Sequence, residues 1–423
     1  MDAHTITRFE HEKLLAKDAG VDKALISALE QYHGIRGTPY FTLIHQGVRF
    51  NQFVGVIRVG RWTVKVLPKV DRLTGDAGVW EEVLVRMLRL TNGFPAQPTS
   101  DTQLRVLPNS ILNLYLELFI SECEILTHQG LAKTYQRRTD NRPVMKGRLK
   151  LSEHIRHNLT HKERFVVEYS SYDQNHLINR ILKQALIVIN RLTPVPVHQN
   201  RVRRLLLDFE EIREVMPTEA SFKSILFHRK NLHYKKAIQI ARMILLNVHP
   251  DFSRGRDDVL ALMFDMNDLW EQYAALQIRR HLRDRFTVAA QKSKVFWVSD
   301  QRKKGLRPDL VLSDRRDDDR KIIVDTKWKV PVDHLPDNED LRQMFAYNHL
   351  FGCRESILLY PGAFQGVSEG VSGEYRTPDG SRCHVLSLNV LDAAGRLMLG
   401  REFVRPLGEF VSGEHGVTSP EKH

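Results

Sequence analysis

Residues 307–330 read RPDLVLSDRRDDDRKIIVDTKWKV, two short apolar runs joined by a highly charged loop. The runs LVL and KIIV have the length and composition of neighbouring buried strands. Asp309 lies at the start of the first run and Asp325 at the end of the second. In an antiparallel hairpin these two positions lie at the same edge, so we expect the two carboxylates to be close together.

A lysine completes this group. Lys327 follows Asp325 by two residues, so both side chains point to the same face of the strand. Two carboxylates without a cation between them repel each other, and oxygen ligands of this kind suit Mg²⁺. A Mg²⁺ ion activates water and offsets charge on a phosphate, while Lys327 orients or deprotonates that water or stabilises the pentacoordinate phosphate. The pattern predicts hydrolysis of a phosphodiester.

The composition favours a polyanionic partner. The 423 residues include 63 Lys and Arg against 51 Asp and Glu, which gives a net charge of +12 and a pI of about 9.5. Nucleic acid is the commonest partner for such a balance, and a solvated basic surface is the alternative. The most basic stretch, residues 131–165, has ten Lys and Arg against three acids. It either contacts DNA or an acidic partner surface, or it is a solvated face.

The cysteines and the termini restrict the environment. Cys123, Cys353 and Cys383 are far apart and form no CxxC pair, which predicts free, buried thiols rather than a zinc ribbon. The N-terminus lacks the apolar core of a signal peptide, and no apolar run reaches the roughly 18 residues of a membrane span. We therefore expect a cytoplasmic protein without a membrane partner.

The patterns predict an α+β fold in three parts. Residues 1–105 form a β-rich N-terminal region that binds a partner, residues 106–250 a basic helical middle region, and residues 251–423 an α/β endonuclease domain. In the first part, RWTVKVLP alternates with period two and pairs across Gly60 with NQFVGVIRV. In the second, residues 109–130 form a buried amphipathic helix that Gly130 ends.

The last part reads α-β-β-β-α-β, or the same order with an extra strand near its start. The segment DDVLALMFDMNDLWEQYAALQIRRHLRD has an apolar stripe that predicts one long core helix. Strands follow at FTVAAQ, KVFWVS, RPDLVLS and KIIVDTKWKV. A helix then covers NEDLRQMFAYNHLFG, with Asn338 as its candidate cap, and ESILLYPG and CHVLSLNVL are further strands. Trp328 points away from Lys327 and is expected to pack in the core, and the aspartates in RRDDDRK form a solvated turn.

This arrangement resembles the PD-(D/E)xK nuclease superfamily. Pro308-Asp309 supplies the PD, and Asp325-Thr326-Lys327 supplies the DxK. The resemblance implies a restriction-endonuclease-like fold that uses Mg²⁺, with Mn²⁺ as a possible substitute. It assigns Asp309, Asp325 and Lys327 to catalysis, and Asp309 and Asp325 to the metal.

The same resemblance implies two supporting residues on the flanking helices. The first core helix of that fold often carries another acid, for which Glu271 in NDLWEQY is the candidate metal ligand and Asp268 the runner-up. The helix after the DxK strand often contributes a glutamine. Gln343 in DLRQMFAY fits as a catalytic residue, with Tyr347 one turn further along the same face.

The whole chain is similar to the McrC family, the nuclease subunits of McrBC modification-dependent (type IV) restriction systems. The segments GVIRVGRWTVKVLPKVD, MKGRLKL, NHLINRILKQAL, MNDLWEQY, RPDLVL, DTKWK and DLRQMFAY occur in the family's order. The resemblance implies cleavage of foreign double-stranded DNA that contains 5-methylcytosine. It also implies a McrB-like AAA+ GTPase hexamer as partner, whose GTP hydrolysis the N-terminal part of the subunit stimulates. The sequence contains no GxxxxGK[ST] motif, so GTP is expected to bind to the partner rather than to this chain.

Two other functions are consistent with these patterns. The chain could be a non-cleaving regulator of the GTPase ring, or a self-sufficient PD-(D/E)xK nuclease. The intact D…DxK pattern argues against the first, and the long N-terminal half without a catalytic pattern argues against the second.

Overall fold

The chain forms two compact units in a computed structural model. Unit 1 comprises Met1–Ser110 and Met263–His423, and unit 2 comprises Ile111–Leu262. The structure describes residues 4–36, 39–59, 62–69, 76–91, 111–193, 195–249, 259–300, 302–317, 319–329, 335–362, 371–375 and 380–412. The domain boundaries predicted after residues 105 and 250 lie outside these ranges.

The N-terminal part of unit 1 is β-rich, as the alternating sequence predicts. Its elements are β1 (His4–Phe9), β2 (Lys13–Leu15), α1 (Lys23–Arg36), β3 (Phe41–Ile44), β4 (Gly47–Phe50), β5 (Phe53–Val59), β6 (Trp62–Leu67) and α2 (Ala77–Thr91). Strand β6 pairs antiparallel with β5, which confirms the predicted hairpin, and parallel with β1. Trp62, Val64 and Val66 are buried because alternate residues of a strand share one face.

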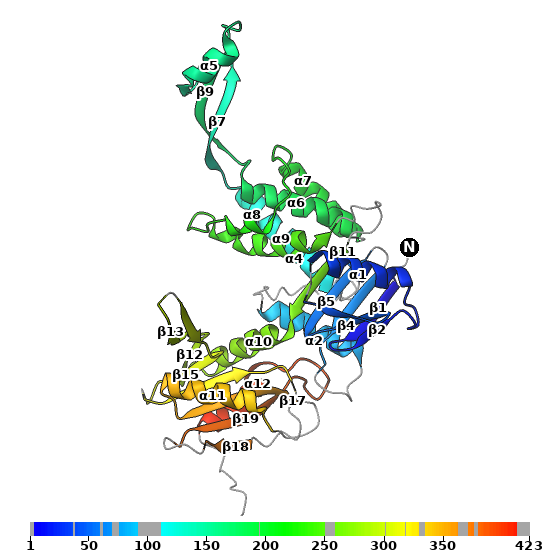
Figure 1. The fold of residues 1–423 in the computed structure, drawn as a ribbon, viewed down its shortest axis with the longest axis vertical. Helices are drawn as coiled ribbons and strands as arrows, with labels where there is room; N and C mark the ends of the chain where they lie inside the picture. Colours follow the sequence, from blue (N-terminus) through cyan, green and yellow to red (C-terminus); the bar gives the residue numbers. More distant parts are fainter. Residues whose placement is uncertain are drawn as a thin grey trace, which may run out of the picture. The chain divides into compact units, whose positions relative to one another are not determined.

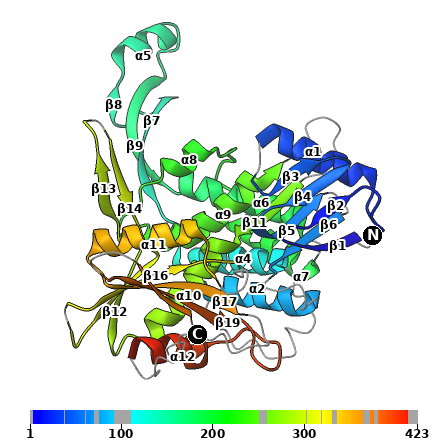
Figure 2. The same cartoon turned by 60° about the horizontal axis from the view of Figure 1, so that its bottom comes forward.

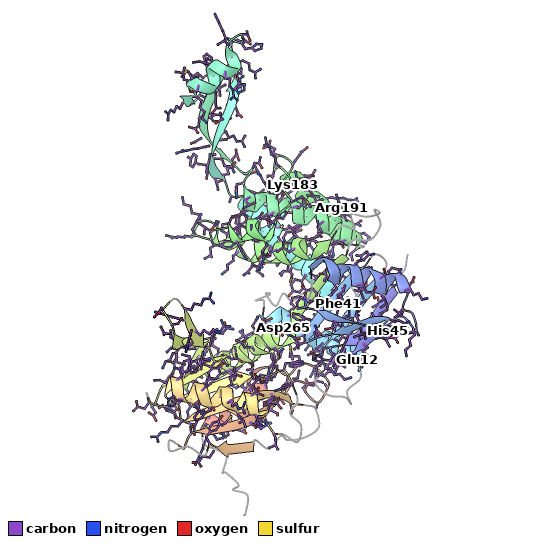
Figure 3. The ribbon with its side chains drawn as sticks, in the orientation of Figure 1. Glu12, Phe41, His45, Lys183, Arg191 and Asp265 are labelled. Carbon is purple, nitrogen blue, oxygen red and sulfur yellow. The ribbon has the colours of Figure 1, made fainter. Side chains whose placement is uncertain are left out.

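Unit 2 is mainly helical. Its elements are α4 (Ile111–Gln129), β7 (Thr134–Arg142), β8 (Arg148–Leu149), α5 (Leu151–Asn158), β9 (Phe165–Asp173), α6 (Leu177–Leu192), α7 (Pro196–Asp208), α8 (Glu219–Lys223), η1 (Leu232–Tyr234), α9 (Lys235–Asn247) and β10 (Val248–His249). Helices α4, α6, α7 and α9 pack on one another, and α4 confirms the predicted buried helix. Lys183 and Arg191 lie on α6, as labelled in Figure 3.

The basic stretch 131–165 is largely an extended β arm, so the expectation of a helical middle region is wrong for this segment. Strand β7 pairs antiparallel along its length with β9, from Thr134 opposite Asp173 to Arg142 opposite Phe165. The arm extends from the helices of unit 2, and α5 lies at its far end (Figure 1). Strand β7, TYQRRTDNR, is polar apart from Tyr135 and has no buried residue, which suits a two-stranded ribbon exposed on both faces.

The C-terminal part of unit 1 is built on a mixed sheet. It contains α10 (Met266–His281), β12 (Phe286–Ala290), β13 (Lys294–Val298), β14 (Lys303–Leu306), β15 (Leu310–Asp314), β16 (Lys321–Thr326), α11 (Asn338–Phe351), β17 (Glu355–Gly362), β18 (Val371–Glu374), β19 (Arg382–Asn389) and α12 (Gly400–Ser412). The sheet order is β12-β15-β16-β17-β19-β18. Helix α11 covers one face of the sheet and α10 and α12 the other (Figure 2). The predicted strands and second helix are therefore present.

The prediction of one long helix from residue 257 is wrong. Val259–Asp265 forms strand β11, which crosses the division between the units, and α10 begins only at Met266. The Asp265 side chain accepts a hydrogen bond from the Asn267 backbone N–H, which caps α10. Asp265 is labelled in Figure 3. The apolar run VLALMF is therefore a buried strand, an assignment that periodicity alone cannot separate from a short helix.

Smaller expectations have mixed outcomes. Helix α11 has Asp337, not Asn338, at its N-cap, and no side chain caps it. All three cysteines are free and buried, as predicted. Within the described residues, no helix is long and apolar enough to cross a membrane.

Candidate active site

The two aspartates of the PD and DxK patterns meet at one edge of the mixed sheet. Strands β15 and β16 are antiparallel, with Leu310 opposite Val324, so Asp309 and Asp325 follow as neighbours. Asp309 Oδ2 accepts hydrogen bonds from the backbone N–H and the hydroxyl of Thr326, each at 2.7 Å. These two donors fix the orientation of the Asp309 carboxylate beside the end of β16.

Lys327 is held between an acid and an amide. Its Nζ lies 2.8 Å from Asp325 Oδ2 and donates a hydrogen bond to Gln343 Oε1 at 2.9 Å. Its backbone N–H donates to the Leu359 carbonyl at 3.0 Å, which continues the pairing of β16 with β17. Two side-chain contacts therefore hold the ammonium group, and the backbone hydrogen bond fixes the residue that carries it.

Helix α11 supports this arrangement through a short chain of hydrogen bonds. Gln343 Nε2 donates to the Tyr347 hydroxyl at 2.7 Å, and that hydroxyl donates to the Arg307 carbonyl at 3.2 Å. Gln343 and Tyr347 are four residues apart and so share one helix face. These hydrogen bonds connect α11 to the segment that leads into Asp309.

The carboxylates repel each other. Burial, with only 2 % of Asp325 exposed, together with the negative charge of Asp309 raises the pKa of Asp325 above its usual range, although Lys327 opposes this. One ammonium group does not neutralise two adjacent carboxylates in a partly desolvated position. A further cation would relieve this repulsion.

The donor set suits one Mg²⁺ ion held by two carboxylates. No group of three or more His, Cys, Asp or Glu side chains in the described residues is arranged to hold a metal ion. Mg²⁺, however, is usually bound through only one or two carboxylates and keeps several waters. No described residue donates a hydrogen bond to Asp309 Oδ1, so this oxygen remains for a ligand.

Glu271 lies in the electrostatic range of this pair but does not complete a three-carboxylate group. Burial and the charge of Asp309 raise the pKa of Glu271, and its Oε1 accepts a hydrogen bond from Gln291 Nε2 at 2.8 Å. Burial and the charges of Asp265 and Asp309 likewise raise the pKa of Asp268, which is exposed. Metal binding by Glu271 or Asp268 stays a prediction.

Asp340 was missed by the sequence patterns although it lies against the site. This buried carboxylate accepts a hydrogen bond from the Tyr360 hydroxyl at 2.8 Å and lies 2.8 Å from Lys329 Nζ and 3.9 Å from Lys327 Nζ. It precedes Gln343 by three residues and therefore shares a helix face with it. This spacing from Gln343 is the sequence feature that could have identified Asp340 as a residue of the site.

Trp328 joins the site to the N-terminal part of the same unit. It is buried, as predicted, and its indole ring packs 5.5 Å from that of Trp270. Its Nε1 donates to Glu10 Oε1 at 2.7 Å, and the Lys69 backbone N–H donates to the same oxygen at 2.8 Å. Trp328 also directly follows Lys327 in the chain. A residue just after β1 therefore helps to anchor the segment that carries Lys327.

Comparison with known proteins is consistent with this architecture. A family model described as McrBC 5-methylcytosine restriction system component matches residues 48–361. A solved structure of McrC bound to McrB AAA+ hexamers of Thermococcus gammatolerans, from a tetradecameric assembly, has a TM-score of 0.66 at 18 % identity. That match covers 96 % of this chain and 100 % of that chain. A cryo-EM structure of the Thermococcus gammatolerans McrBC complex matches with a TM-score of 0.49 at 19 % identity, over 66 % of this chain and 88 % of that chain. No curated protein matches the chain.

The fold is thus the mixed α+β architecture found in McrC of the solved complex. The family model spans most of the sequence, and the chain belongs to the McrBC 5-methylcytosine restriction system component family.

Proposed function

We propose that this chain is the Mg²⁺-dependent endonuclease subunit of a GTP-driven restriction complex that cleaves methylated double-stranded DNA. The observation that carries the proposal is the convergence of Asp309, Asp325 and Lys327 at one sheet edge. A structural role alone does not require two mutually repelling carboxylates side by side when one of them is buried. Membership of a restriction-system family supports DNA as the substrate.

Asp309 and Asp325 are the proposed metal-binding residues. A Mg²⁺ ion held there supplies a Lewis acid that offsets the negative charge developing on the phosphate and lowers the pKa of water. The hydrogen bonds from Thr326 keep Asp309 oriented before any ligand binds. Less reorganisation is then needed during the reaction.

Lys327 is the proposed electrophilic and orienting group. Asp325 and Gln343 hold its Nζ at the edge where the two carboxylates meet. From there an ammonium group can donate a hydrogen bond to a phosphate oxygen or orient a water for attack. Gln343 is a positioning residue in this scheme, because it acts through Lys327.

The β7–β9 arm is the proposed contact with an AAA+ GTPase hexamer. Large apolar side chains are exposed towards its far end, at Val144, Met145, Leu151, Ile155 and Leu159. Exposed apolar residues in this number mark a protein-binding surface rather than a purely phosphate-binding one. The similar Thermococcus gammatolerans McrC is bound to McrB AAA+ hexamers, which supports a ring of this kind as partner.

The test is plasmid cleavage with the purified chain, the protein encoded by the neighbouring gene, GTP and Mg²⁺. Wild type is expected to cut methylated but not unmethylated plasmid. Asp309→Ala and Lys327→Ala should each reduce cleavage by about a thousandfold or more. Asp317→Ala, an exposed turn carboxylate in the same β15–β16 connection, is the matched control and should cut normally.

The same variants separate this proposal from its alternatives. Asp309→Ala should stimulate GTP hydrolysis by the partner as well as wild type does. Unchanged cleavage by Asp309→Ala would exclude the assigned site. GTPase stimulation without any cleavage by wild type would favour the regulator, and cleavage by wild type without partner or GTP would favour the self-sufficient nuclease.

A further inference from the structure

A β-hairpin beside the candidate active site exposes apolar side chains on both faces. Strands β13 and β14 pair with each other as a separate two-stranded sheet. The side chains of four consecutive residues are 53, 61, 50 and 60 % exposed, at Val295, Phe296, Trp297 and Val298 respectively. Trp297 and Val298 are consecutive in the paired strand, so their side chains point to opposite faces and apolar surface is exposed on both. Only the start of β13 reaches α11 among the contacts described, where Lys294 Nζ donates to the Leu350 carbonyl at 3.3 Å. Apolar exposure of this kind marks a binding surface.

The same hairpin is strongly basic. From the residue after β12 to the PD pattern, the chain carries one acid, Asp300, and six cations: Lys292, Lys294, Arg302, Lys303, Lys304 and Arg307. Within the described residues, Arg302, Lys303 and Lys304 form no ion pair. Their charge is therefore available to an anionic ligand.

The base of the hairpin is attached to the candidate active site. Gln291 precedes β13, donates its backbone N–H to the Asp309 carbonyl at 2.8 Å and donates its side chain to Glu271. At the other strand, Leu306 packs against the core cluster that contains Tyr347. Only Arg307 and Pro308 separate β14 from Asp309. The hairpin is thus fixed at its base, while its apolar strand stays exposed.

We infer that the β13–β14 hairpin inserts Phe296 and Trp297 into a groove of duplex DNA that lies beside the sheet edge carrying Asp309, Asp325 and Lys327. Arg302, Lys303 and Lys304 then contact the flanking phosphates. The inference rests on the proposed function, because that function supplies the duplex at this edge. Aromatic side chains bind DNA by stacking on bases or by wedging between base steps, and basic residues beside them neutralise the backbone.

Charge favours DNA over a protein as the occupant. The buried centres of protein interfaces are depleted in charged residues, and lysine is depleted across them. Here Lys304 and Lys303 of β14 lie opposite Trp297 and Val298 of β13, and their positive charge complements a polyanion. A second copy of this chain would bring the same cations against one another.

Tryptophan fluorescence tests the contact without requiring cleavage. Four of the five tryptophans, Trp62, Trp80, Trp270 and Trp328, are buried, so Trp297 is the one that a solvent quencher reaches most readily. Titration of the full chain with duplex DNA, without Mg²⁺ and at low salt, should quench this emission and protect it from acrylamide. Trp297→Phe should abolish both signals and keep most of the affinity, since it retains an aromatic face.

Binding by further variants quantifies the contact. The double variant Phe296→Ser/Trp297→Ser should bind duplex about tenfold or more weakly. Replacing Arg302, Lys303 and Lys304 by glutamine should lower the slope of log affinity against log salt by about three. Leu226→Ser, which changes another highly exposed apolar residue outside this hairpin, is the control and should bind like wild type.

The outcomes are distinct. Loss of affinity confined to the hairpin variants, with DNA-dependent quenching of Trp297, supports the inference. If wild type binds in this way but fails to cut, only the proposed function is contradicted. Equal DNA affinity in the double variant and Leu226→Ser, or no duplex binding by wild type, overturns it. A change of oligomeric state in the double variant with unchanged DNA affinity overturns it in favour of a protein contact.

Discussion

Two clusters in this molecule each combine two carboxylates with one cation, and they behave in opposite ways. In unit 2, Arg201 donates to both oxygens of Glu117 at 2.7 Å and to both oxygens of Glu124 at 2.8 and 2.7 Å. In unit 1, Lys327 Nζ lies 2.8 Å from Asp325 and 3.9 Å from Asp340, while Asp309 accepts hydrogen bonds from Thr326 at one oxygen only. In the first cluster every carboxylate oxygen pairs with the cation, whereas in the second the negative charge of the carboxylates is not fully neutralised.

The pKa values follow the geometry. Although burial alone raises it, hydrogen bonds from His198 and Arg201 lower the pKa of Glu117 to about 2. Burial and the charge of Asp309 raise the pKa of Asp325 despite Lys327. The planar fork of an arginine serves two carboxylates at once, whereas an ammonium group is a point charge. The choice of cation therefore decides whether such a cluster is structural or available for a ligand.

Exchanging the cation in the active-site cluster should have the largest effect. Lys327→Arg keeps the positive charge, but the guanidinium group pairs with both carboxylates and displaces the contact with Gln343. We expect cleavage to fall about a thousandfold, equivalent to about 4 kcal/mol in the barrier, with the melting temperature nearly unchanged. Single-turnover plasmid cleavage and thermal unfolding measure the two quantities. Near-normal cleavage by Lys327→Arg would show that the type of cation does not decide whether such a cluster is structural or available for a ligand.

Glu10 extends the comparison to a carboxylate that no basic side chain of the described residues reaches within hydrogen-bonding distance, since His11 Nε2 lies 3.9 Å from its Oε2. Burial, with a smaller contribution from Asp265, raises its pKa from 4.5 to about 7, against the hydrogen bonds from Trp328 and Lys69. The folded protein therefore holds a proton that the unfolded chain releases. The stability that depends on it is complete below about pH 4.5 and is lost as the pH rises through about 7.

Glu10→Gln imitates the protonated side chain at every pH. At pH 8 we expect the free energy of unfolding to exceed that of wild type by up to about 3 kcal/mol, and the difference to vanish below about pH 4.5. Urea unfolding between pH 4 and pH 8 measures it. Glu163→Gln, an exposed acid, is the control and should show no such trend. A difference that is constant with pH contradicts the interpretation.

Removing the amide that positions Lys327 should have a moderate effect. Gln343→Ala leaves the ion pair with Asp325 but lets the ammonium group move. We expect about a tenfold loss in kcat, equivalent to about 1.4 kcal/mol, with little change in the Mg²⁺ concentration needed. Kinetics at saturating DNA measure this, and Gln343→Glu, which keeps an acceptor for Lys327, should recover part of the rate. An unchanged kcat in Gln343→Ala would remove Gln343 from the site.

The smallest effect is expected in the cluster of unit 2. Arg201→Lys replaces the fork by a point charge that cannot serve Glu117 and Glu124 together. Because both acids are about 40 % exposed, water compensates for much of the loss, and we expect about 1 kcal/mol of destabilisation. Cleavage by the folded protein should not change. A loss of cleavage larger than the loss of folded protein would mean that this cluster is not purely structural.

Local patterns predicted the parts of the fold that depend on neighbouring residues. The antiparallel pairing of β15 and β16 and the face shared by Gln343 and Tyr347 follow from spacing within one or two elements. The strand at Val259–Asp265 was mistaken for a helix because a short apolar run fits both periods. The sequence pattern places Asp265 inside the same helix, whereas in the structure Asp265 caps α10 and so separates the strand from the helix.

Contacts between distant segments could not be predicted in this way. The hydrogen bond from Trp328 to Glu10 joins residues 318 positions apart, and no local spacing encodes it. The exposure of both faces of β13 was equally hidden, because KVFWV has the composition of a buried strand. In both cases the tertiary surroundings, rather than propensity, determine what each side chain does.

The hydrogen bond between Glu10 and Trp328 also forms late during synthesis of the chain, because its two residues are made far apart in time. At about 5–20 residues per second, roughly 15–60 s of synthesis separate the emergence of the two side chains from the ribosome. During that interval the residue behind β1 lacks its indole donor, and the segment with Lys327 does not yet exist. The sheet edge that carries the candidate site is thus completed late, after the whole of unit 2 has been synthesised.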